Sequence, residues 1–225
     1  MGIAVRFGPP DPSYKGQETR ERILDALYEL LRSSPAAKLG MADVAAKAGL
    51  RRSSIYNHFR TVDEMCLALV DRSTAPVLHQ MRLDQAPDLA SYILYGFVAL
   101  FEQWAEHHVV YVTMLEVYAR DPMFARAWNE NVTQLWPRQA VKLYTADVEA
   151  GRLRPMPCPK ETLEFFAFGL QHRFHRLWRF GPPTPEEAYV ALEAPFTMLW
   201  RTLGLPGDVP LDRRRIDEAL ARSGT

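Results

Sequence analysis

The stretch Met41-Ala-Asp-Val-Ala-Ala-Lys-Ala-Gly-Leu-Arg-Arg-Ser-Ser-Ile-Tyr-Asn-His-Phe59 predicts two short helices joined by a tight turn. Ala45 is small enough to let two helix backbones approach closely, and Gly49 can adopt the positive φ that ends a helix abruptly. The apolar side chains that would form the shared core are Met41, Val44, Ala48, Leu50, Ile55 and Phe59. This layout is typical of a helix-turn-helix unit.

The side chains left for the outer face of the second helix are polar or basic, and none is acidic. They are Arg51, Arg52, Ser53, Ser54, Tyr56, Asn57 and His58. Such groups suit the phosphates and base edges of DNA. A helical hairpin that touches no nucleic acid needs the same alanine, glycine and apolar stripe, so the spacing alone leaves both interpretations open.

The wider context, from Thr19 to about Val70, resembles the DNA-binding domain of the tetracycline-repressor (TetR) family of bacterial transcription regulators. The resemblance is carried by three segments: Thr19-Arg-Glu-Arg-Ile-Leu-Asp-Ala-Leu27, Val44-Ala-Ala-Lys-Ala-Gly49 and Ile55-Tyr-Asn-His-Phe59. The aromatic-x-His-Phe ending of the last segment is a specific signature of that family. The resemblance implies that Tyr56 and His58 hold the DNA backbone, and that Ser54 and Asn57 reach phosphates or bases.

The sequence departs from the family pattern at three positions. Arg51 stands where the family prefers Ser or Thr, Gly40 where a Thr often caps the first helix of the pair, and Val62 where a Lys often meets phosphate. Arg51 and Arg52 can restore the lost attraction, because each neutralised phosphate releases counterions and Arg can form two hydrogen bonds with guanine. Of the two, we expect Arg52 to make the base contact.

Length and charge predict a second, larger unit behind this DNA-binding region. The chain has 225 residues, whereas a small DNA-binding domain needs roughly 50–60. Residues 1–60 carry ten Lys and Arg against six Asp and Glu, and the remainder carries seventeen against twenty-one. We therefore expect a mobile N-terminal arm over 1–17, a helix-turn-helix domain over 18–60, and a ligand-sensing and dimerisation domain over 61–225.

The sequence carries no signal for a membrane span, a metal centre, a cofactor or an enzyme. The longest apolar run, residues 93–101, is about half of the ~20 residues that a spanning helix needs. Cys66 and Cys158 belong to no paired metal or redox spacing, which predicts a reduced, cytoplasmic setting. A phosphate-cradling Gly-rich loop, a nucleophile elbow and a His-Glu-x-x-His motif are all missing from the sequence.

Helical periodicity and start signals predict an all-α fold throughout. Thr61-Val-Asp-Glu64 is a capping box, and Asp121-Pro122 and Thr184-Pro-Glu-Glu187 place a proline at the first helical position after a capping residue. Pro137 and Pro195 fall inside predicted helices, where we expect a kink or a break. The expected helices span about 19–32, the region from 61 onward, 88–108, 109–119, 122–150, 160–180 and 185–203, with a short tail helix after 212.

The predicted helix over 160–180 is apolar on more than one side. Two such sides favour a homodimer in which this helix and the one over 185–203 form a four-helix bundle with their symmetry mates, as the resemblance also implies. The alternative is that these side chains serve only the core of one monomer. On the same helix, Arg173, Arg176 and Arg179 predict a solvated face or a rim of salt bridges across a dimer, and His172 with His175 predicts a structural or solvent-facing pair rather than a metal site.

The middle helices are rich in large side chains that could line a ligand pocket, although such residues most often form plain core. The pocket itself is implied by the family resemblance. Our candidates for ligand contact are Trp104, His107, Tyr111, Met114, Tyr118, Trp128, Phe168, Gln171 and His172. Further polar groups that could orient a ligand are Gln103, Thr113, Glu116, Asn131 and His175.

Together these features predict a homodimeric, ligand-responsive repressor that binds a near-palindromic DNA operator and is released by a small molecule. The alternative is a DNA-binding regulator or architectural protein without a small-molecule effector.

Overall fold

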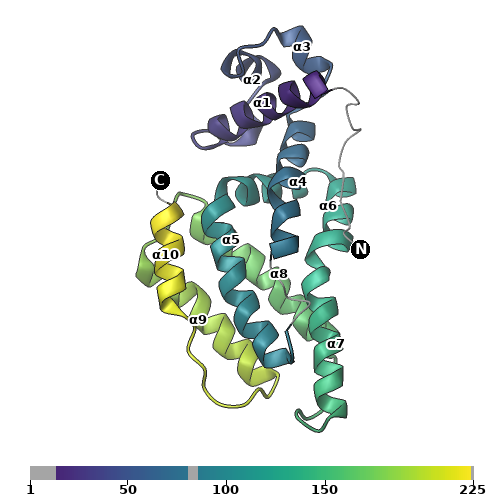
Figure 1. Ribbon diagram of the computed structural model, residues 1–225, viewed down its shortest axis with the longest axis vertical. Helices are drawn as coiled ribbons and strands as arrows, with labels where there is room; N and C mark the ends of the chain where they lie inside the picture. The colour runs from purple at the N-terminus through teal and green to yellow at the C-terminus, as the bar shows by residue number, and fades with distance from the viewer. Residues whose placement is uncertain (1–13, 81–85, 224–225) are drawn as a thin grey trace. The chain divides into compact units, whose positions relative to one another are not determined.

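The computed structural model describes residues 14–80 and 86–223, and over these residues it contains helices and no strand (Figure 1). The prediction of an all-α fold is confirmed. The chain divides into two compact units that are each discontinuous in sequence. Unit 1 comprises Met1–His79 and Val109–Ala125, and unit 2 comprises Gln80–His108 and Arg126–Thr225.

Unit 1 is built around a first helix that buries one apolar side. Its elements are α1 (Tyr14–Leu31), the 3-10 turn η1 (Ala36–Lys38), α2 (Met41–Lys47), α3 (Arg52–Tyr56) and most of α4 (Val62–Gln80). Ile23, Leu24 and Leu27 of α1 are buried together with Val44 and Ile55 of the next two helices. α1 begins at Tyr14 rather than near Thr19, so part of the segment expected to be an arm is helical; residues 1–13 lie outside the described part of the chain.

The helix α5 (Leu89–Tyr118) runs through a region where the sequence predicts two helices, over 88–108 and 109–119. No glycine or proline separates His108 from Val109, so the helix continues across that point. The predicted break takes the form of a kink, because His107 has the non-helical angles φ −123° and ψ 23°. The division between unit 2 and unit 1 falls directly after it.

Unit 2 contains the first part of α5 and the remaining helices. These are the end of α6 (Pro122–Trp128), the π-helical turn η3 (Asn129–Thr133), α7 (Leu135–Glu149), α8 (Pro159–Trp178), α9 (Pro185–Thr202) and α10 (Arg213–Ser223). The single helix predicted over 122–150 is thus interrupted at η3 and not at Pro137. Pro137 lies in the first turn of α7, where a missing N–H leaves no helical hydrogen bond unmade.

The core of unit 2 is a cluster of aromatic rings from α5 and α8. The rings of Phe101 and Trp178 lie 4.9 Å apart between centroids, and those of Trp104 and Phe174 lie 6.0 Å apart. All four side chains are essentially inaccessible to solvent. Rings in edge-on and tilted contact add to the free energy gained by burying their area, so this cluster fixes α8 against α5.

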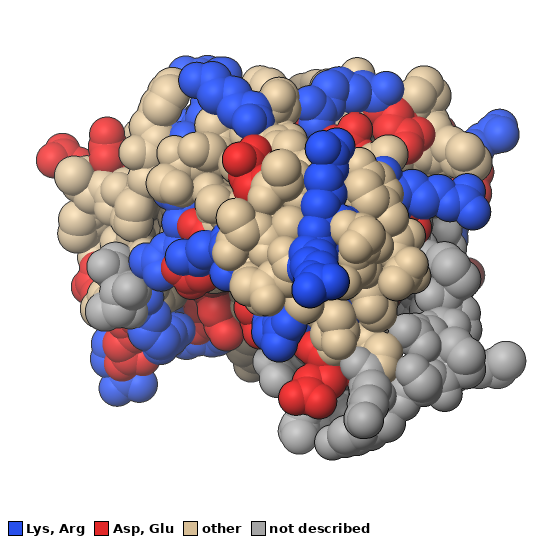
Figure 2. All heavy atoms as spheres, turned by 90° about the horizontal axis from the view of Figure 1, so that it is seen from above, with Lys and Arg blue, Asp and Glu red and all other residues tan. Residues whose placement is uncertain are grey.

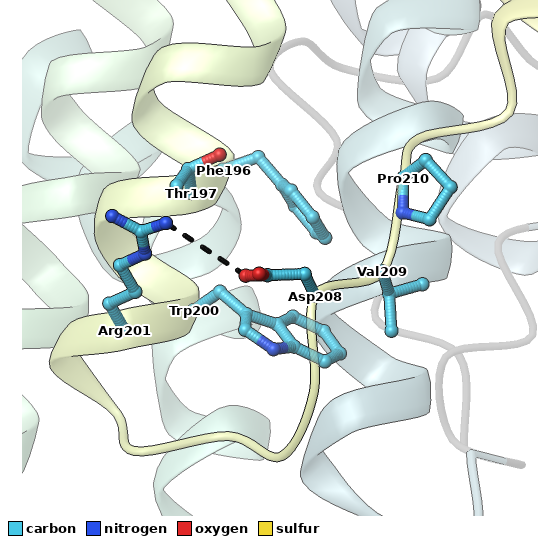
Figure 3. A pocket seen from close by; sticks show the side chains of 7 residues that line it. All are labelled: Phe196, Thr197, Trp200, Arg201, Asp208, Val209 and Pro210. Carbon is cyan, nitrogen blue, oxygen red and sulfur yellow. Dashed lines mark ion pairs between the residues drawn. The ribbon is translucent and has the colours of Figure 1, made fainter.

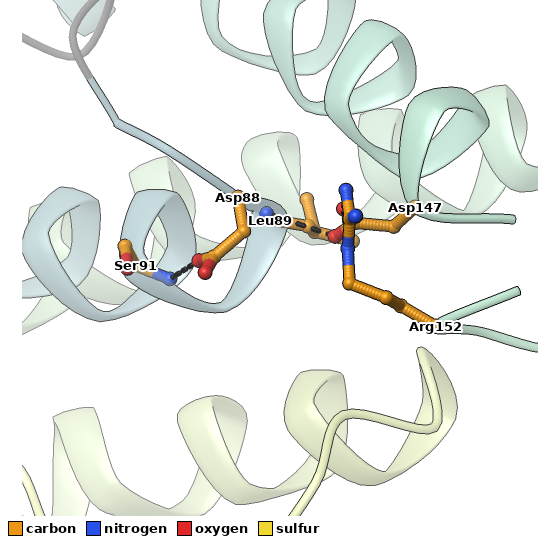
Figure 4. Close-up of polar contacts among 5 residues, drawn as sticks. All are labelled: Asp88, Leu89, Ser91, Asp147 and Arg152. Atoms are coloured by element: carbon orange, nitrogen blue, oxygen red, sulfur yellow. Dashed lines mark hydrogen bonds and ion pairs between the residues drawn. The ribbon is translucent and has the colours of Figure 1, made fainter. Parts of the chain in front are cut away.

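The first turn of α5 is held by a buried carboxylate of α7 (Figure 4). Oδ2 of Asp147 accepts a hydrogen bond from the Leu89 amide at 3.1 Å, and its Oδ1 accepts from Nε of Arg152 at 2.9 Å. Asp88 caps the same turn by accepting from the Ser91 amide at 2.7 Å. The otherwise costly burial of the Asp147 charge is offset by the guanidinium and by the free amide at the helix start.

Arg173 on α8 replaces a hydrogen bond that a proline removes from α9. Pro195 has no N–H, so the Ala191 carbonyl four residues earlier loses its helical donor. Nε of Arg173 donates to that carbonyl at 2.7 Å, and its Nη2 donates to the Val190 carbonyl at 2.8 Å. α9 continues past Pro195 without a break, and Arg173, which stays exposed as its predicted solvated face requires, joins α8 to α9.

The tail helix predicted after Asp212 is present as α10 and is fastened to two other helices by charged groups. Arg215 binds Glu102 of α5 through two hydrogen bonds, of 2.9 and 2.6 Å, and Arg213 binds Glu193 of α9 at 2.6 Å. Within the described residues, no helix is both long and apolar enough to cross a membrane.

Candidate nucleic-acid interface

The turn between α2 and α3 has the geometry that the sequence predicts. Gly49 adopts φ +64°, the Leu50 amide donates to the Ala45 carbonyl at 2.9 Å, and the Gly49 amide donates to the Ala46 carbonyl at 3.2 Å. These two bonds form a Schellman motif, which requires the left-handed residue that glycine supplies. The turn therefore fixes the direction in which the chain enters α3.

The N-terminus of α2 is capped without the threonine that is common at position 40 in the family that the sequence resembles. Gly40 is the N-cap residue and has no side chain to accept a hydrogen bond. Instead, the Gly40 amide donates to Oδ2 of Asp43 at 2.8 Å, which is one half of a capping box. The carboxylate also lies at the end of the helix dipole that attracts negative charge.

α3 buries one side and presents the predicted donors on the other. Ile55 and Phe59 are buried, with exposed fractions of 0% and 1%. The exposed residues are Arg51, Arg52, Ser53, Tyr56 and Asn57, and Ser54 and His58 are half-buried. Figure 2 looks down on this end of the chain and shows Lys and Arg side chains among uncharged ones over the middle of the face. Residues 51–58, with their buried Ile55 aside, therefore form an outward-facing, acid-free surface.

Two residues of this surface contact each other. Nη2 of Arg52 donates to the Tyr56 hydroxyl at 3.1 Å, and the guanidinium carbon lies 5.8 Å from the centre of the tyrosine ring. The residues are four apart on one helix, so their side chains extend along the same face. Because a guanidinium has five N–H groups, Arg52 keeps donors for DNA while its position is restricted.

Arg20 of α1 supports the end of α3, and sequence reasoning missed it. Its guanidinium carbon lies 4.1 Å from the centre of the Phe59 ring, and its Nη1 donates to the His58 carbonyl at 3.2 Å. A cation over a ring and a bond to a carbonyl at a helix end both favour this placement. The contact spans 38 residues of sequence, and no local spacing signals it.

The helix that follows the surface is tied to the rest of unit 1 at several points. Half of the capping box predicted at Thr61 and Glu64 is present, since the Glu64 amide donates to Oγ1 of Thr61 at 3.0 Å. The Glu64 carboxylate accepts from the preceding amide, that of Arg60, at 2.7 Å. Arg72 of α4 binds Asp25 of α1 at 2.7 Å, and Arg120 binds Asp63 at 3.0 Å. These contacts fix α4 against α1 and against the end of α5.

The residues predicted to contact a ligand are divided between the two units. Unit 2 holds Trp104, His107, Trp128, Phe168, Gln171 and His172, and unit 1 holds Tyr111, Met114 and Tyr118. Trp104, Tyr111, Met114 and Trp128 are buried, whereas Phe168 and His172 are exposed and the other three are half-buried. Trp104 belongs to the aromatic core cluster. The assignment of these nine residues to a ligand site stays a prediction.

Among the additional polar candidates, two present buried oxygens that accept no hydrogen bond: Oε1 of Gln103 and Oε2 of Glu116. Oγ1 of Thr113, by contrast, donates to the Val109 carbonyl at 2.8 Å. The side chain of Asn131 lies outside the described residues. An unpaired buried oxygen costs free energy, and a ligand donor would relieve that cost.

His107 and His175 sit in surroundings that disfavour a charge on the ring. Burial lowers the pKa of His107, against the opposing effect of the Glu106 carboxylate. Burial, followed by the charges of Arg179 and His172, lowers the pKa of His175. The rings of His172 and His175 lie 6.4 Å apart, and the described residues contain no cluster of three metal-ligating side chains.

A cavity of about 340 Å³ lies in unit 2 beside the end of α9 (Figure 3). Its lining residues are Phe196, Thr197, Trp200, Arg201, Asp208, Val209 and Pro210. None of them is among the predicted ligand contacts. No sequence signal pointed to this cavity, because Phe196 and Trp200 have the spacing of ordinary core residues and the segment 208–210 lies between helices.

Comparison with known proteins finds a family match over the helix-turn-helix region. Residues 23–69 match the model of the bacterial regulatory proteins of the tetR family. Three solved structures share the fold. The fatty acid degradation regulator FadR from Bacillus halodurans is 16% identical, with 89% of this chain and 100% of that chain covered and a TM-score of 0.63.

The two others are also regulators. SmeT, the repressor of the Stenotrophomonas maltophilia multidrug efflux pump SmeDEF, is 22% identical, with 81% of this chain and 91% of that chain covered and a TM-score of 0.59. FadR from Thermus thermophilus, a TetR-family transcriptional repressor in complex with lauroyl-CoA, is 21% identical, with 86% and 98% covered and a TM-score of 0.58. The resemblance that the sequence predicts is confirmed.

Proposed function

We propose that this chain, whose residues 23–69 match the bacterial regulatory proteins of the tetR family, binds a near-palindromic operator as a homodimer and represses transcription. The observation that carries this proposal is the outward-facing surface of residues 51–58, which holds donors and no acid and is fixed by the turn at Gly49. α3 would lie in the major groove, with Arg52 directed at bases and Tyr56, His58, Ser54 and Asn57 at the backbone and nearby bases.

The homodimer is supported by apolar side chains on the outside of α8 and α9. Phe165 and Met198 have exposed fractions of 73% and 60%, and Phe168 and Val190 are exposed as well. Exposed apolar groups on neighbouring helices favour association with a second copy. Two copies related by a two-fold axis can place their α3 helices in successive major grooves, roughly 34 Å apart.

The proposed regulator responds to a small molecule held among the middle helices. This part of the proposal is supported by the unpaired buried oxygen of Gln103 and by the match of residues 23–69 to the tetR family. The Thermus FadR structure holds lauroyl-CoA, which favours an effector with a large apolar part. The alternative, a DNA-binding regulator without an effector, rests on the placement of Trp104 in the core cluster.

Release from DNA would be a shift between two populated states of the protein. An effector can shift them only through its different affinities for the two states, and reversing a 99:1 balance takes about 5.5 kcal/mol. In this mechanism α4 moves the two DNA-binding units out of register with the grooves. The protein would act in the cytoplasm, where the operator is, and would catalyse no reaction.

Selection of binding sites from random duplexes tests the proposal, and recovery of a palindrome is the expected result. We then expect Tyr56→Phe and His58→Ala to weaken binding evenly across sequences, and Arg52→Ala to lower the salt dependence. Arg52→Ala should in addition change the preferred base, at a cost of about 1–3 kcal/mol for the wild-type site. Arg32→Ala, which removes an exposed arginine elsewhere in unit 1, is the matched control.

Unchanged operator affinity in Arg52→Ala, Tyr56→Phe and His58→Ala would overturn the contact assignments. Failure of the wild type to bind any duplex at low salt would overturn the proposed function. The effector is tested by thermal unfolding with a panel of metabolites: a compound that raises the midpoint and also lowers operator affinity supports the ligand-responsive regulator.

A further inference from the structure

The cavity beside the end of α9 has the composition of a small-molecule site and is unrelated to the proposed DNA contacts. Its volume of about 340 Å³ lies within the ~300–1,000 Å³ typical of ligand pockets. Phe196 and Trp200 supply aromatic surface, and Val209 and Pro210 supply aliphatic surface from the opposite segment (Figure 3). Every lining residue belongs to unit 2.

The aromatic wall is held in a fixed orientation. Nε1 of Trp200 donates to the Gly207 carbonyl at 2.9 Å, which binds the indole to the segment that carries Asp208. The rings of Phe196 and Trp200 lie 5.2 Å apart, and both residues are buried. Because the indole N–H is already used and the two residues are only 4% and 5% exposed, the wall offers a ligand a small area of apolar ring surface and no indole donor.

The charged part of the cavity is one cation and one anion that are not hydrogen-bonded to each other, and Thr197 adds a hydroxyl group. Nη2 of Arg201 and Oδ1 of Asp208 lie 3.9 Å apart, which is beyond hydrogen-bond distance. Their side chains have exposed fractions of 72% and 91%, so solvent screens the attraction and little free energy is lost when the two are separated. Figure 3 shows this pair beside the ring of Trp200.

We propose that this cavity binds a zwitterionic amino acid with an aromatic or large aliphatic side chain. The carboxylate of the ligand would take two hydrogen bonds from Arg201, its ammonium group would donate to Asp208, and its side chain would cover Phe196 and Trp200. A ligand with a single charge would leave one member of the pair without its counter-charge, so a zwitterion matches the site better than a simple acid or amine.

Calorimetric titration of the full chain, without DNA, tests this site with three probes that share a phenyl ring. They are L-phenylalanine, 3-phenylpropionate, which lacks the ammonium group, and phenethylamine, which lacks the carboxylate. We expect L-phenylalanine to bind about fivefold more tightly than either of the others, because each exposed charge contact contributes modestly.

Two variants should change the preference in opposite ways. In Arg201→Gln, phenethylamine should bind as tightly as L-phenylalanine, since the carboxylate has lost its partner. In Asp208→Asn, 3-phenylpropionate should bind as tightly as L-phenylalanine. Arg214→Gln, which breaks an exposed arginine–carboxylate pair within α10, should keep the wild-type order.

Absence of binding by all three probes at millimolar concentration would overturn the inference, including the case in which a second copy covers the cavity. Equal affinities of the wild type for the three probes would also overturn it. So would the wild-type order of affinities in both variants, because the probes would then bind at another site. These titrations contain no DNA, so their outcome is independent of the operator selection that tests the proposed function.

Discussion

At the scale of the single residue, burial separates the two cysteines of the chain. Cys66 is fully buried on α4, and burial, reinforced by the Asp63 carboxylate, raises the pKa of its thiol to about 12. Cys158 is exposed at the start of α8. The thiolate is the reactive form, so the two side chains should differ strongly in reactivity.

We therefore expect a water-soluble aromatic disulfide reagent to modify one cysteine per native chain at pH 8 and two after unfolding in denaturant. Cys158→Ser should abolish the native reaction and leave one reactive thiol in the unfolded chain. Rapid labelling of Cys66 in the native Cys158→Ser variant would contradict this prediction, because it would show that the buried part of α4 is readily exposed to solvent.

The histidine at the kink of α5 should make stability depend on pH. Because burial lowers the pKa of His107 below 6.5, the unfolded chain takes up its proton first as the pH falls. The resulting stability is present above about pH 6.5 and is lost as the pH falls toward the lower folded pKa. His175 acts in the same direction.

Thermal unfolding at pH 7.5 and at pH 5.5 measures this effect. The midpoint of the wild type should fall between the two, that of His107→Gln should fall less, and that of the double variant with His175→Gln least. Parallel falls in all three proteins would assign the acid sensitivity to other groups.

Local chemistry explains which residues of the DNA-binding surface could be predicted. The positive φ at Gly49, the burial of Ile55 and Phe59 and the exposure of Arg51 to Ser53 all follow from helical spacing and from glycine's lack of a side chain. The support that Arg20 gives to Phe59 could not be predicted, because it depends on a contact between segments far apart in sequence.

At the scale of the element, the start signals in the sequence predicted where helices begin, whereas the internal prolines did not predict where helices are interrupted. The start signals at Thr61 and Thr184 both open helices as predicted. Pro137 was expected to break a helix that breaks earlier, at η3, and Pro195 causes no break. A proline is tolerated in the first turn of a helix, or wherever another donor reaches the carbonyl that it leaves unpaired.

The pairing of Arg173 with the carbonyls near Pro195 can be measured by a double-mutant cycle. Arg173→Met should destabilise the wild type by about 1–3 kcal/mol, because two acceptors lose a charged donor. In a Pro195→Ala background the backbone amide gained by the substitution can serve the Ala191 carbonyl, so Arg173→Met should cost less there. Urea unfolding gives the four free energies, and purely additive costs would contradict the coupling.

At the scale of the whole molecule, the two compact units could not be predicted because neither is continuous in sequence. α5 and α6 each contribute to both units, and the kink at His107 lies beside one of the crossings. Periodicity along a chain finds helices, whereas the grouping of helices depends on contacts between distant segments. The contiguous division at residues 17 and 60 stays a prediction, as does the assignment of a ligand site to the middle helices.

The proposed homodimer predicts a linked loss of assembly and operator affinity. Replacing the exposed apolar groups of α8 and α9 in a Phe165→Glu, Met198→Glu double variant should give a monomer by light scattering, since burying these charges would be costly. Operator affinity should fall at least about tenfold, because each monomer holds only one half-site. Tyr95→Glu changes another exposed aromatic residue, on α5, and is the matched control.

A dimeric double variant with normal operator binding would place the interface elsewhere. A dimeric double variant that loses operator binding would instead point to an effect of the charges on folding, which the unfolding midpoint would reveal.

The proline of α9 should also influence which residues occur at position 173 in homologous proteins. Wherever a homologous protein has lost the proline at position 195, the backbone supplies its own donor, and selection on position 173 is relaxed. The two positions should therefore covary through evolution: arginine should be retained in lineages that keep the imino acid and drift freely in those that have replaced it.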